Sequence, residues 1–152
     1  MIDCMMKVSK VKWRISQKHK NDRKRDGSME MKNFFKSMVE QDKCAVVICD
    51  LEHTIIYMNP AAVKNYEKYG GETILGKSLL HCHNPHSCEM IIKVVDWFKK
   101  DISNNIVHTF FNEKQNKDVY MVALRDDEKN LIGYYEKHEY RNRDMSDFYV
   151  FD

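Results

Sequence analysis

The chain has 152 residues, of which 43% are hydrophobic and 32% charged, and its formal net charge is +2. This size and composition suit one globular domain with a real core and exclude a pair of catalytic domains. No stretch reaches the roughly 18 apolar residues of a membrane span, and the first residues lack the apolar block of a secretory signal. We therefore expect a cytoplasmic protein without membrane association, whose five cysteines are free thiols.

Charge is unevenly distributed along the chain. Residues 1–28 hold nine Lys or Arg against three Asp, whereas residues 29–152 hold sixteen basic against twenty acidic side chains. The scarcity of apolar residues among these charges predicts a disordered basic tail over 1–28. With a single aromatic residue and no folded recognition element, the tail disfavours specific nucleic-acid binding. Because the composition changes at Met29 and Met31, either is an alternative to Met1 as the natural start.

Hydrophobic periodicity predicts a helix followed by a hairpin. Apolar residues recur at helical spacing over 31–41, which indicates a short amphipathic helix. Two β-rich runs, 44–49 and 54–58, are separated by a turn and are typical of an antiparallel hairpin. An Asn-Pro pair then ends the second run. Because asparagine caps helices well and proline suits the first helical turn, we expect a short helix over 59–69.

A second Asn-Pro pair, at 84–85, opens a longer helix. Its core face is expected to be an apolar stripe formed by Cys88, Ile91, Val95 and Phe98. Three strand candidates follow and form a meander, at 105–111, 118–124 and 131–139. The middle strand is apolar on both faces, which predicts that the sheet is covered on both sides. The helix over 31–41 and a second copy of the chain are the two candidates for covering the outer face.

This order of elements predicts an α+β domain with a five-stranded antiparallel sheet. Three short motifs stand at defined points in it: Asn59-Pro60-Ala61-Ala62 at a helix start, Leu75-Gly76-Lys77-Ser78-Leu79 before the long helix, and Asn130-Leu131-Ile132-Gly133 in the last turn. Together, order and motifs resemble the PAS domain, a small sensory module, over about residues 31–140. In the last turn Asn130 replaces the usual glycine, a small departure because Asn tolerates positive φ.

Within that family the chain resembles stand-alone PAS proteins of anaerobic Firmicutes and PAS domains that carry a Cys-His-x-Pro segment, here residues 82–85. The resemblance implies a PAS domain over 29–141 and a C-terminal tail over 142–152. It also implies short helices and one longer helix on one face of the sheet, with the N-terminal amphipathic helix on the other. A ligand cavity is expected between the sheet and the longer helix.

The densest polar cluster, residues 81–88, lies at the entry to that pocket helix. It contains five potential metal or haem ligands, namely His81, Cys82, His83, His86 and Cys88. Cys82 or His83 is the candidate axial ligand if the cofactor is haem. The expected cofactor-binding wall adds large side chains from the sheet and the helix, namely Met58, Ile91, Val95, Phe98, Phe110, Met121 and Tyr135. If haem does not bind, the ligand is an unidentified small molecule.

Other interpretations of the cluster remain open. Cys88 is expected to be a small core residue, His86 a solvated one, and His83 a partner of a loop carbonyl. A zinc site normally draws ligand pairs from separate segments, whereas these residues are all local. Cys82 lies near a helix N-terminus that would lower its pKa, which suits a redox thiol or a nucleophile. No third catalytic group is identifiable, so we do not expect an enzyme.

The sequence thus predicts a PAS sensory module that binds a small ligand and signals through dimerisation or through an unidentified protein partner in trans. A haem-based gas or redox sensor that uses Cys82 or His83 is the first alternative. A transcription regulator with a nucleic-acid-binding basic tail is the second. The expected homodimer interface combines the outer sheet face with the apolar residues of helix 31–41, namely Phe34, Phe35, Met38 and Val39.

Overall fold

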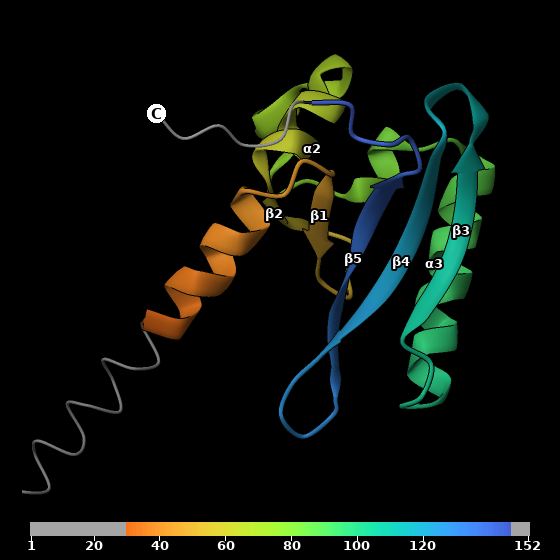
Figure 1. Cartoon of the computed structure of the whole chain (residues 1–152). Helices are drawn as coiled ribbons and strands as arrows, with labels where there is room; N and C mark the ends of the chain where they lie inside the picture. The colour runs from red at the N-terminus through yellow and green to blue at the C-terminus, as the bar shows by residue number, and fades with distance from the viewer. Residues whose placement is uncertain (1–29, 147–152) are drawn as a thin grey trace, which may run out of the picture. The chain divides into compact units, whose positions relative to one another are not determined.

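The computed structural model describes residues 30–146, which fall into two compact units that divide after Gln41 (Figure 1). The predictions made for residues 1–28 and for the end of the C-terminal tail lie outside the described residues. In the first unit, residues 30–40 form a helix, as predicted for 31–41. Its large apolar residues Phe34, Phe35 and Met38 are exposed.

The second unit contains a five-stranded antiparallel sheet in the order β2-β1-β5-β4-β3. Its strands are β1 (Val46–Cys49), β2 (Ile55–Met58), β3 (Ile106–Asn112), β4 (Lys117–Arg125) and β5 (Leu131–Tyr140). The predicted hairpin and the predicted meander are both present, and β5 joins them by pairing with β1 on one side and β4 on the other. The prediction of an α+β domain with this sheet is confirmed.

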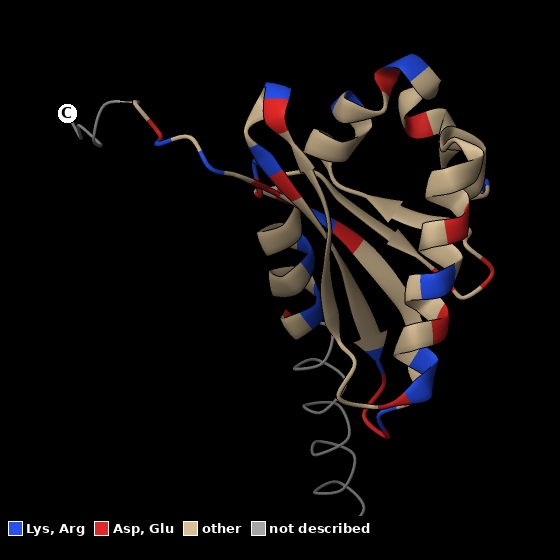
Figure 2. Ribbon diagram, turned by 90° about the vertical axis from the view of Figure 1, so that its right-hand side faces the viewer, with Lys and Arg blue, Asp and Glu red and all other residues tan. Residues whose placement is uncertain are grey.

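Helices line one face of the sheet, as Figure 2 shows. They are α2 (Pro60–Asn65), α3 (Pro85–Lys100) and three short 3-10 turns, η1 (Glu67–Tyr69), η2 (Gly71–Ile74) and η3 (Leu79–Cys82); a fourth turn, η4 (Glu113–Gln115), connects β3 to β4. The predicted helix over 59–69 is wrong in extent, because α2 ends at Asn65 and the chain continues as η1. Gly70, with a left-handed φ of 115°, ends that turn.

Both Asn-Pro pairs begin helices, as predicted. The side chain of Asn59 accepts a hydrogen bond from the backbone N–H of Ala62 at 2.8 Å, and that of Asn84 accepts one from Ser87 at 2.9 Å. The two caps differ in their surroundings, since Asn84 is exposed whereas Asn59 is completely buried. Asn59 therefore also bonds the chain that enters β1.

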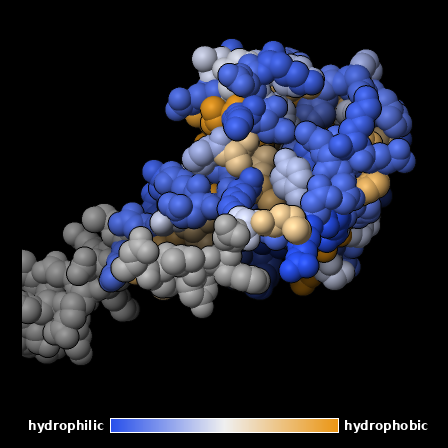
Figure 3. Space-filling model, turned by 45° about the horizontal axis from the view of Figure 1, so that its top comes forward, coloured by the Kyte–Doolittle hydropathy of each residue, from blue (hydrophilic) through white to orange (hydrophobic). Residues whose placement is uncertain are grey.

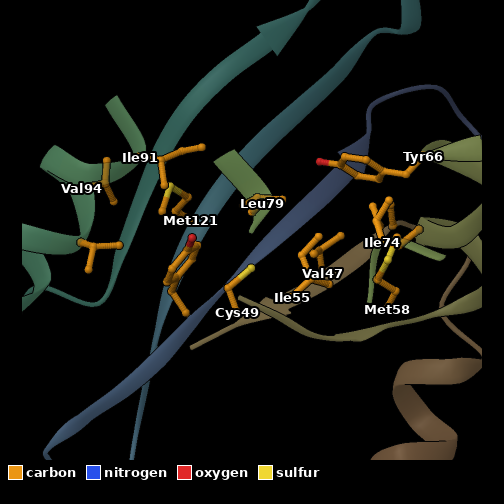
Figure 4. Packing of buried hydrophobic residues seen from close by; sticks show 14 of the residues in the cluster. Val47, Cys49, Ile55, Met58, Tyr66, Ile74, Leu79, Ile91, Val94 and Met121 are labelled. Carbon is orange, nitrogen blue, oxygen red and sulfur yellow. The ribbon is translucent and has the colours of Figure 1, made fainter. Parts of the chain in front are cut away.

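The core lies between the sheet and the helices, as the close view in Figure 4 shows. The sheet contributes Val47 and Cys49 of β1, Ile55 and Met58 of β2, and Met121 of β4; α3 contributes Ile91, Val94, Val95 and Phe98. The surface seen in Figure 3 is mainly hydrophilic, with small separate hydrophobic patches. Burial of the α3 stripe is confirmed except at Cys88, which is half-buried at the first turn of the helix. Its thiol donates to the carbonyl of Leu80 at 3.2 Å.

The turn between β4 and β5 differs from expectation in one detail. Its left-handed residue is Lys129, with φ of 71°, rather than Asn130. Asn130 instead donates its backbone N–H to the carboxylate of Asp126 at 2.8 Å. Position 133 requires glycine because the backbones of β5 and β1 come close together there. A Cβ at Gly133 would lie 2.4 Å from the carbonyl oxygen of Cys49. Only glycine lets β5 pass β1 at that point.

Candidate ligand-binding cleft

A cleft of about 1070 Å³ lies between the inner face of the sheet and the helices of the second unit. Ligand pockets in proteins commonly measure roughly 300–1,000 Å³, so this one is large. Part of its wall is apolar and comes from α3, β3 and β4, namely Met90, Ile91, Val94, Val107, Phe110, Val119 and Met121. The cleft is open on one side, and its apolar wall offers a surface against which a small apolar molecule can pack.

Another part of the wall is a connected chain of buried polar side chains. Glu136 of β5 accepts hydrogen bonds from the hydroxyl of Tyr66 at 3.2 Å and from Nε2 of His138 at 2.6 Å. Lys117 of β4 places its Nζ 3.2 Å from Nδ1 of His138. An ammonium group has no lone pair, so Nδ1 is the acceptor and the ring proton of His138 resides on Nε2. Lys117 and His138 are only 3% and 4% exposed.

Strand alternation explains why these groups face the cleft. Side chains two residues apart on a strand share a face, so Glu136 and His138 lie on the same face as the buried Tyr134. In register, Glu136 pairs with Met121. On β4, Lys117 stands four residues before Met121 and therefore also points inward.

The network sets the ionisation of its members. Burial raises the pKa of Glu136, but the hydrogen bond and electrostatic effect of His138, the electrostatic effect of His83 and the bond from Tyr66 together outweigh it and hold that pKa below its ordinary value. Burial raises the pKa of Tyr66, and the neighbouring Glu136 raises it further. Burial lowers the pKa of Lys117, and Glu136 partly opposes this. At neutral pH the wall therefore presents an ionised Glu136 and a neutral Tyr66.

Five of the nine side chains predicted to bind a cofactor line the cleft, namely Cys82, His83, Ile91, Phe110 and Met121. Met58, Val95 and Phe98 do not, because they are packed within the core at 7%, 1% and 0% exposure. Tyr135 does not line it either. Its neighbours Tyr134 and Glu136 point inward, so alternation turns Tyr135 to the opposite face of the sheet.

His83 and Cys82, the two predicted haem ligands, differ in their chemistry. Nδ1 of His83 lies 3.0 Å from the carbonyl oxygen of Leu79, which confirms the bond to a loop carbonyl and makes Nε2 the lone-pair nitrogen of the ring. The expected lowering of the Cys82 pKa is wrong: burial raises it, and Lys77 offsets this only in part. Cys82 ends η3 and lies outside the first turn of α3, where a helix dipole acts.

The rest of the 81–88 cluster is dispersed. His81 and His86 are exposed, and Cys88 bonds the carbonyl of Leu80. Among residues 30–146, no three His, Cys, Asp or Glu side chains converge as a metal site would require. Nor does that part of the chain contain a helix long and apolar enough to cross a bilayer.

The polar wall was missed by sequence reasoning. Lys117 precedes the predicted strand 118–124 by one residue, and Glu136 and His138 were placed only within the predicted strand 131–139, without a role in the site. The available signal was the period of two, which groups Glu136 and His138 with Tyr134. That signal does not say which of the two faces is buried.

Comparisons with known proteins agree on the fold. The chain matches no protein-family model and no curated protein. Among solved structures, a PAS domain from Colwellia psychrerythraea superposes with a TM-score of 0.56 at 16% identity, over 72% of this chain and 95% of that chain. The PAS domain of an HTR-like protein from Haloarcula marismortui gives 0.53 at 11% identity, over 78% and 98%. The chain has the PAS fold.

A third PAS-like structure, a sensory box sensor histidine kinase from Vibrio cholerae, gives a TM-score of 0.51 at 11% identity, over 76% of this chain and 95% of that chain. Identities this low establish the PAS fold alone. Any ligand of this domain must therefore be argued from the side chains of its own cleft.

Proposed function

We propose that this PAS domain is a sensory module, that a small molecule binds in the cleft, and that the bound state is transmitted through the surface of the domain. The observation that carries the proposal is the combination, in one cleft, of an apolar wall with the buried network of Tyr66, Glu136, His138 and Lys117. Buried charges rarely improve stability over apolar residues of similar size. A few fixed polar groups in an apolar pocket are, however, what orients a ligand.

The test compares two neighbouring positions on β3. Val107 lines the cleft, whereas Ile106 is 56% exposed and pairs with Val122 on the opposite face. Val107→Trp should fill the cleft, and Ile106→Trp should not. A fraction of cell metabolites that contains a ligand at 100 times its Kd stabilises the folded state by about 2.7 kcal/mol. We expect thermal stabilisation of wild type and Ile106→Trp but not of Val107→Trp. Equal responses of the two variants would contradict binding in the cleft.

A haem-based sensor is the second candidate, and the geometry of His83 favours it. A ligating histidine usually donates its second ring N–H to a carbonyl or carboxylate, as Nδ1 of His83 does to Leu79. Bound there, haem would supply an iron that binds gases or changes redox state, with His83 as its holder. Cys82 suits this role less well, because its raised pKa disfavours the thiolate.

A visible spectrum of protein purified from haem-supplemented cells tests this candidate. A Soret band that His83→Ala abolishes or shifts and that Cys82→Ala leaves in place would support it. A colourless protein would remove haem as the ligand and leave the small-molecule proposal intact.

For output we propose a homodimer through the outer face of the sheet and the apolar residues of helix 30–40. Across four strands this face carries a row of successive register partners, namely Ile48, Tyr135, Val122 and Ile106. An apolar row of this kind, with Phe34, Phe35 and Met38 exposed on the helix, is typical of an interface. A second copy of the chain can supply the complementary surface.

Light scattering at micromolar concentration should then report twice 18.2 kDa. Phe35→Glu should shift the mass toward that of the monomer. Ile102→Glu, at an exposed position between α3 and β3, serves as the control and should leave the dimer intact. A monomeric wild type at high concentration would refute this route of output.

A further inference from the structure

Lys117 carries a further inference, which rests on the proposed function because it concerns the same cleft. The side chain is 3% exposed and lines the cleft. Its ammonium has three N–H donors. Among the described residues it contacts Nδ1 of His138 at 3.2 Å and the ring of Tyr140 at 5.6 Å, and it forms no ion pair. Beyond the bond to His138 and the ring of Tyr140, this buried cation has no oxygen acceptor and no carboxylate partner in the described chain.

The nearby carboxylate does not neutralise Lys117 by contact. Glu136 lies beyond the imidazole of His138, which bonds Lys117 through Nδ1 and Glu136 through Nε2. A buried charge without a direct counter-charge is expensive, and an anion placed against it offsets that expense. A negatively charged group beside Lys117 would therefore supply a direct counter-charge, which Glu136 does not.

The other charged residues of the cleft also favour a negatively charged ligand. Three lysines line it, Lys68, Lys114 and Lys117, against a single carboxylate, Glu136. The other ionisable lining groups include four histidines, which do not add negative charge. A cleft lined by one sign of charge concentrates ligands of the opposite sign.

Apolar surface begins directly beside the cation. Along the inner face of β4, the residues after Lys117 are Val119 and Met121, and Phe110 of β3 pairs with Val119. The ligand should therefore be charged at one end and apolar along its body. Of the three lysines only Lys117 is buried, since the other two are exposed. One buried ammonium balances the single negative charge of a carboxylate, whereas a phosphate carries about −1.5 to −2 at pH 7.

We propose that the cleft binds a small carboxylic acid with an aliphatic or aromatic body, whose carboxylate accepts hydrogen bonds from Lys117 and whose body lies along Val119, Met121 and Phe110. The ligand binds as the anion. The bond between Lys117 and His138 fixes the ammonium in place, so the network serves to position the cation.

Calorimetry with matched probes tests the proposal. Octanoate and 4-phenylbutyrate are compared with octanol and 4-phenylbutanol, and phenyl phosphate tests the other anion. A charge-assisted hydrogen bond is worth about tenfold in affinity or more, so the acids should bind the full chain at least about tenfold tighter than the alcohols. Lys117→Met should reduce acid binding to the level of the alcohols and leave alcohol binding unchanged. Lys117→Arg should keep the preference for acids, and Lys100→Met, outside the cleft, is the matched control.

A second readout follows the Lys117 ammonium itself by NMR. Its pKa should rise when octanoate binds and should not change with octanol. Equal binding of acids and alcohols, or tighter binding of phenyl phosphate than of the acids, would overturn the carboxylate proposal and leave the cleft as a ligand site. Failure of every acid to bind would also overturn it. The proposed function is tested separately, and it fails if Ile106→Trp and Val107→Trp respond equally to the metabolite fraction.

Discussion

Asn59 and Asn84 form a matched pair for measuring what a buried polar side chain contributes to this fold. Both precede a proline and cap a helix, with φ −77° and ψ 166° at Asn59 and φ −73° and ψ 163° at Asn84. The exposed Asn84 accepts one hydrogen bond, from Ser87. The buried Asn59 bonds four backbone groups, the N–H groups of Val46 and Ala62 and the carbonyl groups of Cys44 and Asp42.

The expected losses of unfolding free energy follow from these bonds. Asn84→Ala removes an exposed cap, which typically costs about 1 kcal/mol. Asn59→Ala removes a cap and also leaves the buried N–H of Val46 and the carbonyl of Cys44 without their partner, at about 1–3 kcal/mol for each group. The total for Asn59→Ala is then about 3–7 kcal/mol. The two variants should differ by at least about 2 kcal/mol, roughly a thirtyfold difference in the unfolding equilibrium.

Urea unfolding followed by circular dichroism measures both losses. The midpoints should shift while the slope with urea stays the same, because neither change alters the surface exposed on unfolding by much. Losses equal within about 0.5 kcal/mol, the size of an ordinary surface effect, would refute the reasoning. They would mean that the bonds between Asn59 and the chain entering β1 exchange for water at no cost.

Three further predictions concern the sheet and its junctions. Gly133→Ala places a Cβ against the carbonyl of Cys49, so unfolding free energy should fall by about 1–3 kcal/mol; unchanged stability would contradict the close approach. Arg125 donates to the carbonyl of Phe98 and to two other carbonyls after it, so Arg125→Gln should speed amide exchange at the end of α3, and unaltered exchange there would count against this. Burial raises the pKa of Glu136, but the neighbouring His138, His83 and Tyr66 lower that pKa by more. Its contribution to stability is therefore present above the ordinary value of 4.5 and is lost as the pH falls through its lower folded-state pKa. Glu136→Gln should flatten the acid limb of the stability curve, and parallel curves would show that Glu136 contributes nothing there.

The parts of the fold that sequence predicted are those encoded locally. Two Asn-Pro pairs located the starts of α2 and α3, because the cap is formed within one turn of the helix. The strands were located from residue type and alternation. The prediction that Tyr135 faces the pocket was wrong because local sequence does not decide it. Tyr134 and Tyr135 are chemically alike, and only packing against α3 decides which one is inside.

The candidate site was predicted less well for the same reason. The helix-terminus rule applied to Cys82 is local, whereas the burial that raises its pKa comes from the packed domain. Lys117 became part of the site because pairing with Tyr140 of β5 extends β4 by one residue beyond its predicted start. Such effects arise from contacts between segments distant in sequence, which hydrophobic patterning does not record.

The pairing of β4 with β5 has a consequence for how such a cleft can change over time. Lys117, Glu136 and His138 all belong to one hairpin, encoded by the continuous segment 117–140. Strands that are neighbours in sequence pair with little loop closure, so this hairpin depends on local contacts. Its inner face alternates between cleft and core, because Met121 and Tyr134 of the same hairpin belong to the hydrophobic core. The charge of the cleft can therefore be altered by substitutions at Lys117, Glu136 and His138 alone, all within one short stretch of sequence, while the core residues between them stay unchanged.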